Sequence, residues 1–164
     1  MAVLPGKKIS ESQLVSEYIA PLQFQPAGID LSLKEVHSLL DAGHVDFDNS
    51  KRKLSGTGKI EFGDGGSLHL QAGCYKVIYN EYVRIPKDCI ALAYTRSSLL
   101  RCGAYLQCAV WDPGYEGRSE SLLVVGNKNG ITLEKNARIV QLVFFRMETE
   151  AEKGYEGKYK GENK

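Results

Sequence analysis

From about residue 28 onwards, short apolar segments alternate with glycine, aspartate and asparagine, a pattern typical of an all-β protein. Short apolar runs lie at 58–62, 67–71 and 73–85. The β-branched and aromatic residues that favour strands are densest at 75–83, 89–94, 122–125 and 139–145. The pattern therefore predicts a mainly β fold, either a sandwich or a barrel.

Three other segments predict local structure outside these strands. Residues 10–19 have the apolar spacing of an amphipathic helix and begin with a capping box, so we expect one N-terminal helix packed over a sheet. The small hydroxylated and basic residues of 95–101 favour a short helical turn. Residues 127–130 are a turn by composition, and Asn129 followed by Gly130 predicts a hairpin between the flanking strands.

Composition sets the number of domains and limits the kinds of partner. Of the 164 residues, 43% are hydrophobic and 25% charged, so we expect a single β domain over residues 1–150. Residues 151–164 are charged and rich in glycine and lysine, which predicts a flexible C-terminal segment. With 21 basic and 20 acidic side chains, the net charge of +1 favours neither nucleic acid nor a membrane surface, and any anion site must be local.

Several kinds of protein are disfavoured by what the sequence lacks. No apolar run approaches the roughly 20 residues of a membrane helix, and the N-terminus lacks the pattern of a signal peptide, so we expect a cytoplasmic protein. The cysteines show no CxxC spacing, and we expect each to be a small reduced core residue. The motifs of zinc deaminases, His-x-Glu and Pro-Cys-x-x-Cys, are absent.

Asp112 is the strongest candidate for chemistry. It lies between an apolar, strand-like approach at 108–111 and the turn residues Pro113 and Gly114. A carboxylate at such a corner can face a ligand, but an aspartate here can equally start the turn by bonding its own backbone. The local pattern leaves both interpretations open.

A second candidate is a phosphate site around residues 96–101. Arg96, Ser97 and Ser98 directly follow a buried-looking strand, and Arg101 lies five positions after Arg96. Two guanidiniums, two hydroxyls and the free amides at a strand end can hold phosphate oxygens. The alternative is that Ser97 caps a short helix and both arginines are solvated.

Further polar residues stand out from their surroundings. Asp30 lies between apolar neighbours after the Pro26 break, where it either orients a metal-bound water or starts a strand. Gln141 is a polar amide in an apolar strand, so it must bond backbone or face a site. In the C-terminal segment, Lys158 and Tyr159 either close over an anion or form a solvated face.

Together, the candidate segments resemble those of the trimeric dUTPase and dCTP deaminase superfamily, in the same order along the chain. The most specific are the Asp-Pro-Gly-Tyr-x-Gly block and the Arg-Ile-x-Gln-Leu block. The resemblance covers roughly residues 20 to 162 and comprises five segments, at 27–31, 96–98, 112–117, 138–142 and 157–161.

This resemblance implies a distorted jelly-roll-like barrel or sandwich that assembles as a homotrimer, with active sites between neighbouring subunits. It also implies deoxynucleoside triphosphate substrates with Mg²⁺. In the dUTPase branch, the aspartate matching Asp112 activates the water that attacks the α-phosphorus, releasing pyrophosphate and dUMP. That reaction limits uracil in DNA and supplies dUMP for thymidylate synthesis. The remaining residues then act as clamps, because phosphoryl transfer depends mainly on positioning and charge stabilisation.

The resemblance implies a role for each remaining candidate. Tyr115 packs against the deoxyribose and excludes a ribose 2′-hydroxyl. Asp30 and Gln141 act through water on Mg²⁺ and the phosphates. Further substrate contacts are expected from two groups: the phosphate-binding Arg96, Ser97, Ser98 and Arg101, and the C-terminal Tyr155, Lys158 and Tyr159, which close over the site.

One acidic position separates the two branches of the superfamily. Deaminases carry a glutamate ten residues after the matching aspartate, and here that position is Leu122, or Val124 when counted back from Asn127. Glu120 would lie roughly 7 Å from Leu122 along a regular strand, too far for direct proton transfer. We therefore expect a dUTP diphosphatase. The alternatives are a dCTP deaminase, a bifunctional enzyme that makes dUMP from dCTP, and a non-catalytic nucleotide sensor.

Two positions and the C-terminal segment depart from the dUTPase pattern. Trp111 is bulkier than the usual isoleucine, and Glu162 stands where the deaminase type tends to have glutamine. The C-terminal segment lacks the glycine-rich ending with phenylalanine that is usual in dUTPases, so we expect it to bind phosphate differently.

Overall fold

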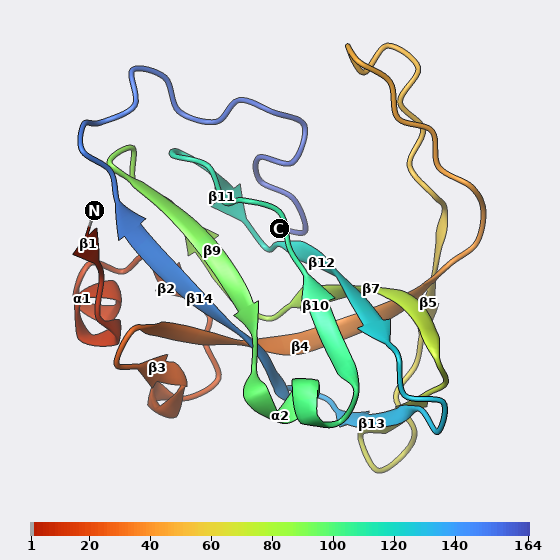
Figure 1. The fold of residues 1–164 in the computed structure, drawn as a ribbon. Coiled ribbons are helices and arrows are strands. Elements are labelled where there is room, and N and C mark those ends of the chain that lie inside the picture. Colours follow the sequence, from red (N-terminus) through yellow and green to blue (C-terminus); the bar gives the residue numbers. More distant parts are fainter. Residues whose placement is uncertain (1) are drawn as a thin grey trace.

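The computed structural model describes residues 2–164 and consists mainly of strands (Figure 1). The elements follow in this order: β1 (Ala2–Val3), α1 (Gly6–Glu11), β2 (Val15–Ser16), the 3-10 turn η1 (Pro21–Gln23), β3 (Phe24–Gln25), β4 (Gly28–Leu39), β5 (Thr57–Ile60), β6 (Ser67–Leu70), β7 (Gly73–Tyr79), β8 (Tyr82–Arg84), β9 (Cys89–Thr95), α2 (Ser97–Arg101), β10 (Ala104–Gln107), β11 (Glu116–Gly117), β12 (Glu120–Val125), β13 (Ile131–Glu134) and β14 (Arg138–Arg146).

Most strands belong to one nine-stranded antiparallel sheet. Its main path runs β1-β14-β4-β7-β12-β10, and β3, β5 and β9 pair at its flanks. The long strand β4 changes partners along its length, from β14 to β7 and β5, and a register shift accompanies the pairings with β14 and β7. Such bulges curl a sheet. Two small sheets, β11-β8-β2 and β13-β6, complete the predicted all-β fold, which is confirmed.

The core lies inside the curled sheet, where alternate residues of the strands point inward. Ile29, Leu31 and Leu33 of β4 have no exposed surface, and the same holds for Leu142 and Phe144 of β14. This period of two is the pattern that predicted strands from the sequence. The intervening side chains point away from the core, and on β4 and β12 some of them face candidate sites.

The N-terminal helix differs from the prediction. It spans Gly6–Glu11 rather than 10–19, and it begins directly after Pro5, whose restricted φ is compatible with a helix start. Gln13 has a positive φ of 51° just beyond the helix, and Val15 then pairs with Val83 in an extended conformation. Of the apolar residues that suggested a longer helix, Leu14 and Val15 are buried, with Val15 reaching the core from a strand, whereas Tyr18 and Ile19 are exposed.

The predicted hairpin at 127–130 is also wrong, although its turn forms. Gly130 donates its backbone N–H to the Asn127 carbonyl at 2.9 Å, and its φ of +75° suits glycine. The strands on either side do not pair, however, because both edges of β12 are already occupied by β7 and β10, and β13 pairs with β6 instead.

The cysteines are free, but not all of them are core residues. Cys89 is buried and Cys108 is half-buried, whereas Cys74 and Cys102 are exposed, so the core prediction was wrong for these two. Cys74 lies on the outward side of β7, and Cys102 follows the last residue of α2. Burial raises the pKa of the Cys89 thiol to about 11. None of the helices in residues 2–164 is long and apolar enough to span a membrane.

Glu81 is a fully buried carboxylate that links η1 to β4. One carboxylate oxygen accepts hydrogen bonds from Gln23 Nε2 at 2.6 Å and Ser32 Oγ at 2.5 Å, and the other accepts one from the Ser32 backbone N–H at 2.9 Å. Burial raises the pKa of Glu81, and these hydrogen bonds oppose the shift. The sequence pattern did not identify this network.

We expect Glu81→Ala to lower the free energy of unfolding by about 3 kcal/mol, because it leaves the buried donors of Gln23 and Ser32 without an acceptor. The urea-unfolding midpoint measures the effect. Glu61→Ala is the matched control, since Glu61 is exposed and pairs only at the surface with Lys59, and its midpoint should not move. A loss below about 1 kcal/mol for Glu81→Ala would contradict this role for the network.

Candidate active site

A cavity of about 760 Å³ opens where β10 and β12 separate. Their pairing ends at Gln107 of β10 and Leu122 of β12. The chain after β10 then leaves β12 and crosses to β9, where Trp111 and Ala91 exchange two backbone hydrogen bonds of 3.0 Å. The cavity is lined by residues from four parts of the chain: Leu39, Leu54, Ser55 and Thr57; Lys76; Ala109, Val110, Trp111, Asp112, Tyr115, Ser119, Glu120, Ser121 and Leu122; and Tyr155, Tyr159 and Glu162.

Asp112 follows Trp111 at the first position of the turn, and the turn bond uses its backbone carbonyl instead of its side chain. Its carbonyl accepts a hydrogen bond from the Tyr115 N–H at 3.0 Å and so closes the turn, while the residue is exposed and lines the cavity. Gly114 has a φ of +80°, and a Cβ there would lie 2.7 Å from the Gly154 Cα. The turn thus requires glycine, and it fixes the position of Asp112.

A chain of hydrogen bonds connects the residue before Asp112 to the C-terminal segment. Trp111 Nε1 donates to Ser119 Oγ at 2.5 Å, the Ser119 and Tyr115 hydroxyls are 3.0 Å apart, and the Tyr115 hydroxyl donates to Glu162 Oε1 at 2.8 Å. Burial raises the pKa values of both Tyr115 and Glu162, so the phenol remains a donor. This chain explains the tryptophan at position 111, whose indole N–H an isoleucine lacks.

The C-terminal segment packs on the turn after Asp112 and on β11 of its own chain. The Tyr155 N–H donates to the Pro113 carbonyl at 2.7 Å, the Arg118 N–H donates to the Glu162 carbonyl at 3.0 Å, and the Tyr155 ring meets the Tyr115 ring edge-on at 5.8 Å. Figure 1 shows this segment in blue, close to β11. Tyr155 and Tyr159 line the cavity, whereas Lys158 is exposed and does not.

Asp30 and two arginines form a second polar cluster. Asp30 is 2% exposed, and its Oδ2 lies 3.1 Å from Arg96 Nε and 3.2 Å from Arg138 Nη1. Burial raises the pKa of Asp30, and the two guanidiniums oppose that shift. Nearby, Gly28 is required for space, because a Cβ there would lie 2.2 Å from the Leu142 carbonyl oxygen.

The other predicted phosphate ligands lie on or beside this cluster. Ser97 and Ser98 are the first residues of α2 and Arg101 is its last, and all three are exposed. Gln141 is half-buried and directly opposite Asp30 in the pairing of β14 with β4. None of these residues lines the cavity, so one chain holds the predicted site residues in two separate groups.

Comparison with known proteins identifies the family. A sequence profile described as dCTP deaminase-like matches residues 6–147. A probable deoxyuridine 5′-triphosphate nucleotidohydrolase of Methanosarcina mazei is 56% identical over 141 residues, which are 86% of this chain and 82% of the relative. The chain belongs to the dCTP deaminase-like family.

Two further similarities extend this result. A probable deoxyuridine 5′-triphosphate nucleotidohydrolase of Archaeoglobus fulgidus is 49% identical over 168 residues, 99% of this chain and 98% of the relative. The crystal structure of 2′-deoxycytidine 5′-triphosphate deaminase from Agrobacterium tumefaciens superposes with a TM-score of 0.63 and 19% identity, over 87% of this chain and 47% of that chain. The second similarity supports the fold alone.

The resemblance put the acid of a deaminase at the position of Leu122 or Val124, and of these two residues Leu122 lines the cavity. Glu120, Ser121 and Leu122 of β12 all line the cavity, and β12 pairs with β7 in continuous register from Glu120 to Val125, so the strand is regular here. Glu120 is bound to Lys76 of β7, with 2.9 Å between Oε1 and Nζ.

Sequence reasoning missed several residues of these two groups. Lys76 and Arg138 were not predicted as site residues, and Glu162 was noted only as a departure from the family pattern. Lys76 is far from Asp112 in sequence and reaches the cavity only because β7 pairs with β12. The arginine of the Arg-Ile-x-Gln-Leu block was the one available signal for Arg138.

Proposed function

We propose that the protein hydrolyses dUTP to dUMP and pyrophosphate at the cavity that Asp112 lines. The observation that carries this proposal is a carboxylate fixed by a tight turn at the edge of a nucleotide-sized cavity, with Leu122 where a deaminase needs an acid. Two relatives at 56% and 49% identity are named as probable deoxyuridine 5′-triphosphate nucleotidohydrolases. Hydrolysis in the cytoplasm would limit uracil in DNA and supply dUMP.

In this reaction Asp112 accepts a proton from a water molecule and orients it toward the α-phosphorus. The turn fixes the backbone of Asp112 before the substrate arrives, and such positioning is the contribution that phosphoryl transfer requires most. Pyrophosphate leaves on the opposite side of the phosphorus. Tyr115 lines the cavity beside Asp112 and is proposed to pack against the deoxyribose.

A second copy of the chain is proposed to complete the site. Among the described residues that line the cavity, Lys76 carries the only positive charge, and Asp112, Glu120 and Glu162 are acidic. A triphosphate needs several cationic or N–H donors. Arg96, Ser97, Ser98 and Arg101 of a neighbouring copy supply them in a homotrimer, and this agrees with their position outside the cavity of their own chain.

Mg²⁺ is proposed to reach this site with the nucleotide. Residues 2–164 contain no group of three or more histidine, cysteine, aspartate or glutamate side chains suited to a metal ion. A site without such a cluster still fits Mg²⁺, because this ion commonly keeps its waters and binds mainly through substrate phosphates. Both arginines use Oδ2 of Asp30, so Oδ1 can accept a hydrogen bond from a metal-bound water, with Gln141 beside it. The bound ion would neutralise charge that develops on the phosphates.

The C-terminal segment is proposed to close over the bound nucleotide. Tyr155 and Tyr159 already line the cavity, and Lys158 lies between them in sequence, where a small rotation of the segment would direct its ammonium toward a phosphate. The backbone hydrogen bonds of this segment to Pro113 and Glu116 support closure over the cavity of its own chain.

A dCTP deaminase or a bifunctional enzyme is the second candidate, favoured by one observation. Glu120 places a carboxylate in the cavity within two residues of Leu122. Against this candidate, Glu120 Oε1 is already paired with Lys76 Nζ at 2.9 Å. A non-catalytic nucleotide sensor would keep the cavity but release no product.

Product formation under controlled metal supply tests the proposal. With dUTP and Mg²⁺ we expect equal amounts of dUMP and pyrophosphate, and we expect EDTA to stop the reaction, because no cluster in the described residues can retain the ion without the nucleotide. Tight dUTP binding without pyrophosphate release would favour the sensor. Undiminished turnover in EDTA would contradict the metal requirement.

Tyr115→Ala should raise the kcat/KM ratio of UTP to dUTP about tenfold, because removal of the ring makes room for the ribose 2′-hydroxyl. Tyr115→Phe is the matched control. It keeps the ring but loses the hydrogen bonds to Ser119 and Glu162, so its selectivity for deoxyribose should match that of the wild type. The same change in both variants would assign the selectivity to the hydroxyl instead of the ring.

A further inference from the structure

We propose that Lys76 and Glu120 together recognise the base of the nucleotide, with Lys76 donating to O4 of uracil and Glu120 accepting its N3–H. This inference rests on the proposed function, because it assigns the base of a deoxyuridine nucleotide to this part of the cavity. It gives a role in substrate specificity to two residues that the catalytic step does not use.

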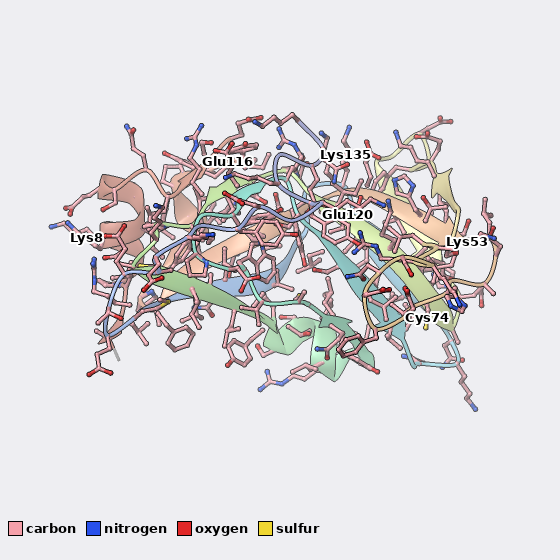
Figure 2. The ribbon with its side chains drawn as sticks, turned by 90° about the horizontal axis from the view of Figure 1, so that it is seen from above. Lys8, Lys53, Cys74, Glu116, Glu120 and Lys135 are labelled. Atoms are coloured by element: carbon pink, nitrogen blue, oxygen red, sulfur yellow. The ribbon has the colours of Figure 1, made fainter. Side chains whose placement is uncertain are left out.

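The two side chains form a fixed polar pair in an otherwise mainly apolar wall. They come from neighbouring strands, β7 and β12, with Nζ and Oε1 2.9 Å apart, and their side chains are 23% and 31% exposed. Leu122 lies directly opposite Lys76 across the two strands and lines the same wall. Partial burial limits solvent screening, so the pair can discriminate between ligands more strongly than a surface ion pair. Figure 2 shows Glu120 near the middle of the molecule, seen from above.

The pair offers an ammonium donor beside a carboxylate acceptor, and this order matches uracil. Uracil presents the O4 acceptor next to the N3–H donor. Cytosine in the same position presents its 4-amino donor to the ammonium and its N3 acceptor to the carboxylate, so both contacts become repulsive. A site discriminates strongly against a substrate that leaves a buried polar group of the site unpaired, or that places donor against donor and acceptor against acceptor.

The C-terminal segment shows that Glu120 accepts an amide N–H in this part of the molecule. Asn163 Nδ2 donates to Glu120 Oε1 at 3.2 Å and to the Arg118 carbonyl at 2.9 Å. The carboxamide of asparagine has the same donor and acceptor groups as one half of the uracil imide. We infer that the base N3–H takes the place of this Asn163 contact when nucleotide binds.

The experiment compares Lys76→Met with the wild type, using analogues that are bound but not hydrolysed. The ligands are the α,β-imido forms of dUTP, dCTP and 4-thio-dUTP, in which sulfur makes a weak acceptor at position 4. Calorimetry measures the three Kd values for each protein. Pyrophosphate release from dUTP by the wild type is measured separately, so that the proposed function and the base recognition are tested independently.

We expect Lys76→Met to weaken binding of the dUTP analogue roughly 10- to 100-fold, as for a lost hydrogen bond to a charged group, and to tighten binding of the dCTP analogue, because the ammonium no longer opposes the 4-amino group. The 4-thio substitution should weaken binding to the wild type by a similar factor and have no further effect in the variant, because both changes remove one contact. Lys59→Met, at an exposed position of β5, is the matched control and should change none of the three values.

Two results would overturn the proposal. Equal weakening of the dUTP and dCTP analogues would assign Lys76 to the phosphates, and fully additive effects of the 4-thio and Lys76→Met changes would show that the two groups do not touch. Because the Kd values of different ligands are compared within the same folded protein, a lower stability of the variant does not change the comparison. If Lys76→Met does not fold, Lys76→Leu, which also lacks a donor, gives the same cycle. Absence of pyrophosphate from the wild type would instead overturn the proposed function.

Discussion

Asp112→Asn is expected to lower the turnover of dUTP about 10³-fold while changing nucleotide affinity only several-fold. Asparagine keeps the size of the side chain and can still accept a hydrogen bond, but it cannot take a proton from water. The backbone of residue 112 closes the turn through its carbonyl, and this hydrogen bond survives the substitution. The loss should therefore appear in kcat, with KM nearly unchanged.

Steady-state kinetics with a pyrophosphate readout measure this effect. Asp64→Asn is the matched control, because Asp64 is exposed in the turn before β6 and lies outside the cavity. It should retain wild-type rates. A loss of less than about tenfold for Asp112→Asn would remove Asp112 from the role of general base.

Mixed trimers of two inactive variants are expected to recover activity. Asp112→Asn removes the base from the cavity, and Arg101→Ala removes a proposed phosphate ligand from α2, at a cost of about 10²-fold in kcat/KM. If each site takes Asp112 from one copy and Arg101 from another, co-assembled trimers contain some sites with both residues intact. Random mixing in equal amounts makes about one quarter of the sites intact, so about one quarter of wild-type activity should return.

Co-expression of the two variants with different affinity tags gives the mixed assemblies. The control combines both substitutions in one chain and mixes it with the Asp112→Asn chain, which leaves no intact site in either arrangement. If the co-assembled variants stay as inactive as each variant alone, the proposal that a second copy completes the cavity is contradicted.

The strands that could be predicted from the sequence are those whose own residues strongly favour the extended conformation. The dense β-branched segments at 89–94, 122–125 and 139–145 form β9, β12 and β14. Predictions failed where long-range pairing decides the outcome. Val15 becomes a strand residue because Val83 pairs with it, and β13 joins β6 because β12 has no free edge.

In the candidate site too, features set by local sequence could be predicted, and features set by long-range contacts could not. Turn chemistry around Pro113 and Gly114 was sufficient to place Asp112 at a corner, and the structure places its residue on a cavity wall. The contribution of Lys76 and the chain from Trp111 to Glu162 depend on which strands and segments meet in space, which no local pattern encodes. The ion pairs of Asp30 likewise required β4, β9 and β14 to be neighbours.

Product analysis with dUTP and dCTP supplied separately in the presence of Mg²⁺ distinguishes hydrolysis from deamination. We expect dUMP and pyrophosphate in equal amounts from dUTP, and no ammonia from dCTP. Ammonia from dCTP at a rate comparable to pyrophosphate release from dUTP would contradict this expectation, and would make Glu120 a participant in deamination.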